Sequence, residues 1–136
     1  MKKAAAARIL IVEDDAPLLE VLQYVLEDAG YCVLTAEDGA AALKLAATDR
    51  VDLVLLDVGM ANMSGFDVAR TLRSNEATSR IAIAFHTGMG QDVVSSNCSD
   101  DDVFLPKADD VELLLSSIES LVIARKQTAE ATESGR

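Results

Sequence analysis

Short runs of consecutive apolar residues alternate along the chain with segments in which apolar residues recur every three or four positions. An uninterrupted apolar run that is rich in β-branched residues and bounded by turn residues is typical of a strand buried on both faces. The run at 9–12 is wholly apolar, and four further stretches that are mainly apolar, at 31–36, 51–56, 81–85 and 103–105, bring the number of predicted strands to five.

The first interval between strands carries the complete set of helix signals. Asp15 is suited to cap a helix, Pro17 to its first turn and Gly30 to the position just past its end. Between them the expected inward stripe follows helical spacing. Its members are Leu18, Val21, Leu22, Val25 and Leu26.

Similar but weaker patterns predict the other helices. One runs from Asp38 to about Ala47, one starts at Ser64 or Gly65, and one runs from about Asp109 to Arg125. The interval 88–102 is polar, and any helix in it is expected to be short and weakly packed.

Strands that alternate with helices predict an α/β fold with a parallel sheet covered on both faces. The chain has 136 residues, of which half are apolar, so a single domain with a full core is expected. We assign 1–7 to a disordered lead-in, 8–125 to the domain and 126–136 to a flexible polar tail.

Charge and cysteine content narrow the classes of partner. The net charge of −11 disfavours binding to nucleic acid or to an anionic membrane surface, and at 136 residues no second, DNA-reading domain is expected. The acidic residues 13–15 argue against a signal peptide at the N-terminus. Cys32 and Cys98 are too few for a disulfide framework and fit small buried residues or free thiols. A cytoplasmic location is expected.

Polar residues follow the strands where, in open α/β sheets, ligands bind. Glu13 and Asp14 follow the first strand, Asp57 the third, Thr87 the fourth and Lys107 the fifth. Clustered carboxylates repel one another unless a cation is shared, and oxygen ligands suit Mg²⁺. A carboxylate beside a metal ion and an ammonium group can accept a phosphoryl group as a nucleophile.

Two other polar features of the sequence are assigned structural roles rather than functional ones. His86 is the sole histidine, and we interpret it as a strand-end residue satisfied by its neighbours, with a phosphodonor or proton-shuttle role as the alternative. The acidic run 100–102 is interpreted as a solvated loop, with a second metal site as the alternative.

Over about residues 8–125 the chain resembles the receiver domain of two-component response regulators. The resemblance rests on the motifs at 9–15, 53–60, 63–65, 86–88 and 104–107, which read ILIVEDD, LVLLDVGM, MSG, HTG and FLPK. It implies a flavodoxin-like (βα)5 fold, a doubly wound parallel sheet with strand order 2-1-3-4-5.

The resemblance also implies roles for individual residues. Asp57 would be the phosphoacceptor. Asp14 would bind Mg²⁺ directly, Glu13 through water, and Gly59 through its backbone carbonyl. These assignments make Mg²⁺ the expected cofactor.

The remaining roles implied by the resemblance concern the phosphoryl group and the response to it. Thr87 and Lys107 would bind the phosphoryl group. Thr87 and Phe104 would form the switch, although Phe104 lacks the hydroxyl of the tyrosine that is common there. Gly59 and Met89 occupy the two positions that tune autodephosphorylation.

The implied function is that of a stand-alone receiver rather than a metabolic enzyme. The phosphoryl group would come from a phosphohistidine on a histidine kinase or a histidine phosphotransfer protein. The chain would catalyse only its own phosphorylation and dephosphorylation. The output would be a contact with a downstream protein, and a homodimer through the face of the fourth helix, fifth strand and fifth helix is expected.

Departures from the family pattern keep two alternatives open. Ala61 and Ala108 stand where the family has proline, so the Lys107–Ala108 peptide could be cis or trans. These changes and the polar 88–102 segment favour a pseudo-receiver that binds partners without phosphorylation. The other alternative is a Mg²⁺-dependent aspartyl-phosphate phosphatase similar to haloacid dehalogenases, but Gly59 replaces its second aspartate.

Overall fold

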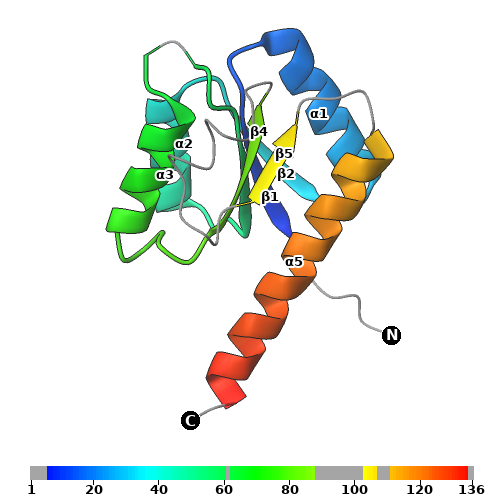
Figure 1. Ribbon diagram of the computed structural model, residues 1–136, viewed down its shortest axis with the longest axis vertical. Coiled ribbons are helices and arrows are strands. Elements are labelled where there is room, and N and C mark those ends of the chain that lie inside the picture. The colour runs from blue at the N-terminus through cyan, green and yellow to red at the C-terminus, as the bar shows by residue number, and fades with distance from the viewer. Residues whose placement is uncertain (1–5, 61, 88–102, 107–110, 135–136) are drawn as a thin grey trace.

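The computed structural model describes residues 6–60, 62–87, 103–106 and 111–134. Within them lies one five-stranded sheet with the order β2-β1-β3-β4-β5, in which every pair of neighbouring strands is parallel (Figure 1). The strands are β1 (Arg8–Val12), β2 (Cys32–Ala36), β3 (Leu53–Leu56), β4 (Ala82–Thr87) and β5 (Val103–Pro106). The predicted fold class and strand order are confirmed.

Four described helices cover the two faces of the sheet. They are α1 (Ala16–Asp28), α2 (Gly39–Thr48), α3 (Gly65–Ser74) and α5 (Val111–Ser134). In Figure 1, α1 and α5 lie on one side of the sheet, and α2 and α3 lie on the other. The polar segment 88–102 lies outside the described residues, so the prediction of a short helix there is not tested.

The core is divided into two layers by the sheet. One layer joins alternate residues of the strands, such as Leu10 and Leu56, to α2 and α3. The other joins the intervening residues, such as Ile11 and Leu55, to α1 and α5. This division explains why β1 from Ile9 onward and the whole of β3 are apolar, because both faces of each strand are buried there.

Helix α1 begins and ends as the sequence predicts. The Asp15 side chain accepts a hydrogen bond of 3.2 Å from the backbone N–H of Leu18. At the other end, the N–H of Gly30 donates to the carbonyl of Glu27, and the N–H of Tyr31 to that of Leu26. These two bonds form a Schellman motif, in which the residue at the position of Gly30 takes a positive φ.

The predicted inward face of α1 is wrong at one position. Val21 is 55% exposed, whereas Leu19, Leu22 and Leu26 are buried. The buried leucines follow the i, i+3, i+7 spacing, and two of them, Leu22 and Leu26, belong to the predicted stripe, so Leu19 takes the inward place predicted for Val21. A run with apolar residues on several sides of a helix does not fix which side faces the sheet.

Substituting Gly30 by alanine is expected to lower the free energy of unfolding by about 1–2 kcal/mol. The φ of Gly30 is +100°, where a Cβ atom is strained even though no atom lies near enough to clash with it. Urea unfolding of the Gly30→Ala protein measures this loss. An unchanged urea midpoint would contradict the expectation that alanine is strained at this position.

Both predicted terminal boundaries need correction. Helix α5 continues to Ser134, beyond the helix end predicted at Arg125. The sequence there is rich in helix-forming alanine, glutamate and glutamine, and it contains no proline and no glycine before Gly135. At the other end, Ala7 is buried, and its carbonyl accepts a hydrogen bond from the N–H of Cys32, so it is not part of a loose lead-in.

Candidate functional site

The carboxyl ends of β1 and β3 lie side by side in the middle of the sheet. Val12 and Leu56 are paired in the register of these two strands. The residue that follows β3, Asp57, still donates its backbone N–H to the carbonyl of Val12, at 3.0 Å. On the other side of β1, the N–H of Glu13 donates to the carbonyl of Ala36, at 3.1 Å. The backbone of both acidic residues is therefore held by the sheet.

Three carboxylates meet at this edge. One oxygen from each of Glu13, Asp14 and Asp57 lies within 4.8 Å of the others. Glu13 is 1% exposed and Asp57 is 5% exposed, whereas Asp14 is exposed to solvent. The backbone N–H of Asp15 donates to Glu13, and that of Gly59 donates to Asp57, at 3.3 and 3.4 Å. The grouping predicted from the strand ends is confirmed.

The chemistry of this group suits a hard divalent cation. Carboxylates this close repel one another, and the two buried ones are shielded from the water that would reduce the repulsion. A cation with oxygen ligands relieves this repulsion, and the exposed Asp14 leaves a route for it from solvent. The residues present therefore fit a Mg²⁺ ion.

Replacing Asp14 by asparagine is expected to stabilise the metal-free protein by about 1 kcal/mol, because it removes one of the mutually repelling charges. It is also expected to reduce the stabilisation that Mg²⁺ gives, since a ligand charge is lost. Thermal unfolding in EDTA and in Mg²⁺ measures both effects. A variant that is less stable than the wild type in EDTA would argue against repulsion within this group.

The other predicted site residues are placed only in part. Gly59 is exposed in the loop after β3, two residues beyond Asp57. Thr87 ends β4, and Phe104 pairs with Phe85 in the register of β5. Predictions about the residues outside the described ranges are not tested. They concern Ala61, Met89, Cys98, the acidic run 100–102, Lys107 and Ala108.

Two further residues singled out from the sequence are described. His86 is buried next to the end of β4. Cys32 is a free and exposed cysteine on the edge strand β2. Of the two interpretations of this residue, the structure therefore fits a free thiol and not a small buried residue. Among the described residues, no helix is long and apolar enough to cross a membrane.

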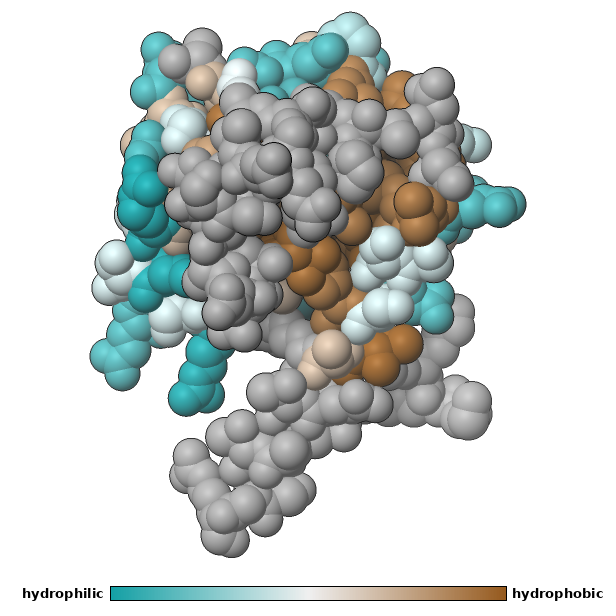
Figure 2. All heavy atoms as spheres, in the orientation of Figure 1, coloured by the Kyte–Doolittle hydropathy of each residue, from teal (hydrophilic) through white to brown (hydrophobic). Residues whose placement is uncertain are grey.

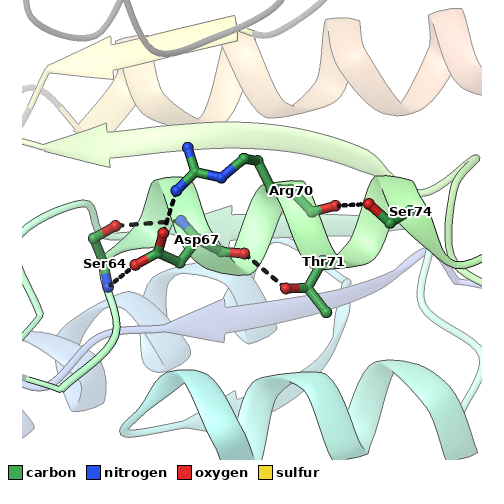
Figure 3. Close-up of polar contacts among 5 residues, drawn as sticks. All are labelled: Ser64, Asp67, Arg70, Thr71 and Ser74. Atoms are coloured by element: carbon green, nitrogen blue, oxygen red, sulfur yellow. Dashed lines mark hydrogen bonds and ion pairs between the residues drawn. The ribbon is translucent and has the colours of Figure 1, made fainter.

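The loop after Asp57 is joined to α3 by residues whose role the sequence analysis missed. The Ser64 hydroxyl accepts a hydrogen bond from the N–H of Asp67, and the Asp67 carboxylate accepts one from the N–H of Ser64 (Figure 3). Hydrogen bonding with Ser64, aided by the nearby Arg70, lowers the pKa of Asp67. The serine followed three residues later by an acidic residue is the sequence signal of this capping box.

Comparisons with known proteins agree on one family. A model of the response regulator receiver domain matches residues 9–119. The DNA-binding dual master transcriptional regulator RpaA of Synechocystis is 36% identical over 117 residues, which cover 85% of this chain and 48% of RpaA. The chain spans about half the length of the curated relatives that it matches first.

Solved structures show the same fold. The chemotaxis protein CheY4 of Vibrio cholerae has a TM-score of 0.81 and 28% identity, and the match covers 86% of this chain and 99% of CheY4. The response regulator TrrA of Thermotoga maritima, solved in complex with Mg²⁺ and BeF, has a TM-score of 0.75 and 31% identity. That match covers 85% of this chain and 98% of TrrA.

Proposed function

Because the chain belongs to the response regulator receiver domain family of two-component systems, we propose that it accepts a phosphoryl group on Asp57. The observation that carries this proposal is the meeting of Asp57 with Glu13 and Asp14 at the carboxyl edge of the sheet. Asp57 is the member of this group that follows the central strand β3, and its backbone is hydrogen-bonded to β1.

The transfer uses Asp57 as a nucleophile. A carboxylate oxygen of Asp57 attacks the phosphorus atom of a phosphohistidine on the donor protein. The bond between phosphorus and the imidazole nitrogen breaks, its electron pair stays on that nitrogen, and the nitrogen takes a proton from solvent. The product on this chain is an acyl phosphate. Since the donor supplies the energy-rich bond, this chain needs to position the acceptor rather than activate a poor nucleophile.

Glu13, Asp14 and Asp57 would hold Mg²⁺, with the backbone carbonyl of Gly59 as a further ligand. Bound Mg²⁺ would neutralise charge on the phosphoryl oxygens. TrrA, which is similar in sequence and fold, binds Mg²⁺ together with BeF. Thr87 and Lys107 would bind the phosphoryl oxygens, which requires Lys107 to reach the group from the end of β5. Thr87 and Phe104 would then transmit the change to the surface.

The partners proposed are a histidine kinase or histidine phosphotransfer protein as donor, and a downstream protein or a second copy of this chain as target. The charge of −11 does not favour nucleic acid as a direct partner of this chain, although RpaA is a DNA-binding protein. Hydrophobic side chains are exposed on α5, at Val111, Leu113 and Ile123, and Figure 2 shows hydrophobic residues on the coloured part of this helix, next to the sheet. They would lie in the homodimer contact.

Phosphotransfer from a donor tests this proposal against its two alternatives. We expect a phosphohistidine-bearing phosphotransfer domain to lose its phosphoryl group to this chain when Mg²⁺ is present, and borohydride to reduce the product at residue 57. No transfer from any of several donors, with partner binding intact, would favour a pseudo-receiver. Sustained hydrolysis of phosphate esters would favour a phosphatase and contradict the proposal that the chain is not a metabolic enzyme.

A further inference from the structure

The first turn of α3 packs directly against the backbone of the proposed acceptor. The N–H of Gly65 donates to the carbonyl of Val58, at 3.0 Å. A Cβ atom added to Gly65 would lie 2.3 Å from the carbonyl oxygen of Asp57 and 2.9 Å from the Cα of Val58. All the close atoms belong to the backbone, so no side chain could rotate away to relieve the contact.

We propose that Gly65, with the Ser64–Asp67 capping box beside it, is the positioning element that sets where Asp57 lies against Glu13 and Asp14. This inference rests on the proposed function, because the position of Asp57 matters through its phosphorylation. Gly65 is a positioning residue and does not touch the reacting atoms.

The backbone of Asp57 is held from two sides. On the sheet side, its N–H donates to the carbonyl of Val12. On the helix side, the contact with Gly65 limits how far its carbonyl can move. The φ of Gly65 is not positive, so the glycine is needed for space rather than for its backbone conformation. A larger residue would have to displace either the acceptor or the whole start of α3.

The start of α3 is itself held by several contacts, so it cannot simply move away from a larger residue at position 65. The reciprocal hydrogen bonds between Ser64 and Asp67 close the first turn, and Arg70 pairs with the Asp67 carboxylate from the next turn (Figure 3). Phe66 is buried against Phe85 of β4, with ring centroids 5.4 Å apart. These contacts transmit a change at Gly65 to Asp57.

Replacing Gly65 by alanine is therefore expected to slow phosphorylation by acetyl phosphate by about a hundredfold, since relief of the contact requires a shift of about 1 Å at the nucleophile. In the absence of metal, hydrogen exchange at the Asp57 amide is expected to become about tenfold faster, because its bond to Val12 is weakened. Calorimetry should also show a weaker binding of Mg²⁺.

Gly39→Ala is the matched control. This glycine is also buried at the start of a helix, but its added Cβ would meet the side chains of Met63 and Val68 rather than the acceptor backbone. We expect Gly39→Ala to lose stability and to keep the rate of phosphorylation within about twofold of the wild type. If Gly65→Ala loses stability in the same way and reacts as fast as the wild type, the inference is overturned.

If Gly65→Ala does not fold, a pair of substitutions at Ser64 tests whether the start of α3 positions Asp57. Ser64→Ala removes the cap and is expected to slow phosphorylation by about fivefold, and Ser64→Thr, which can also cap, is expected to restore it. Equal rates for all three proteins would overturn the inference. Failure of this inference can be distinguished from failure of the proposed function. A wild-type protein that gains no phosphoryl group overturns the proposed function itself.

Discussion

Asp57→Asn is expected to abolish the Mg²⁺-dependent gain of a phosphoryl group, lowering its rate by at least about a hundredfold. The amide oxygen of asparagine carries no full negative charge and cannot form a stable acyl phosphate. Because asparagine and aspartate have nearly the same shape, the buried site should remain folded in this variant. Intact-mass spectrometry after incubation with acetyl phosphate measures the loss.

Asp28→Asn provides the control for this experiment. Asp28 is exposed at the end of α1, near the amino ends of the strands, whereas the carboxylate group lies at their carboxyl ends. The same chemical change there should leave phosphorylation unaffected. If the Asp57→Asn protein were labelled as fully as the wild type and the Asp28→Asn protein, the acceptor would have to be another residue.

Phe85→Ala is expected to lower the free energy of unfolding by about 3–5 kcal/mol. Phe85 is 1% exposed in the middle of β4, and its ring packs on that of Phe66 at the start of α3. Removal of the ring leaves a cavity between the sheet and α3 that the rigid strand cannot close. Chemical denaturation followed by circular dichroism measures the change.

Val21→Ala separates this effect from a general loss of apolar surface. Val21 is exposed on α1, so its truncation is expected to change stability by less than about 0.5 kcal/mol. A loss at Phe85 that is no larger than the loss at Val21 would contradict the packing described between β4 and α3.

The fold was predictable because the strands are marked by composition as well as by order. β1 and β3 are buried on both faces, so their sequences are almost wholly apolar and stand out from the helices. Helix ends were predictable where a cap was present, as at Asp15 and Gly30. The side of α1 that faces the sheet was not fully predictable. Leu18, Leu19, Val21 and Leu22 place apolar residues on several sides of the helix, and tertiary packing determines which of them are buried.

The acidic site was predictable for a different reason. Residues that follow neighbouring parallel strands meet at one edge, so the positions of Glu13, Asp14 and Asp57 in the chain were enough to group them. The contact between Gly65 and Asp57 was not predictable in this way. It depends on how closely α3 approaches the loop after β3, which is a distance in space that no spacing in the sequence specifies.

We propose that Asp57 and its two acidic neighbours form a Mg²⁺-dependent phosphoacceptor site. The most direct test is the intact mass of the wild-type protein after incubation with acetyl phosphate, with Mg²⁺ and with EDTA. We expect the added mass of one phosphoryl group in Mg²⁺ and none in EDTA. An unchanged mass in both conditions, or an adduct that forms equally well in EDTA, would contradict it.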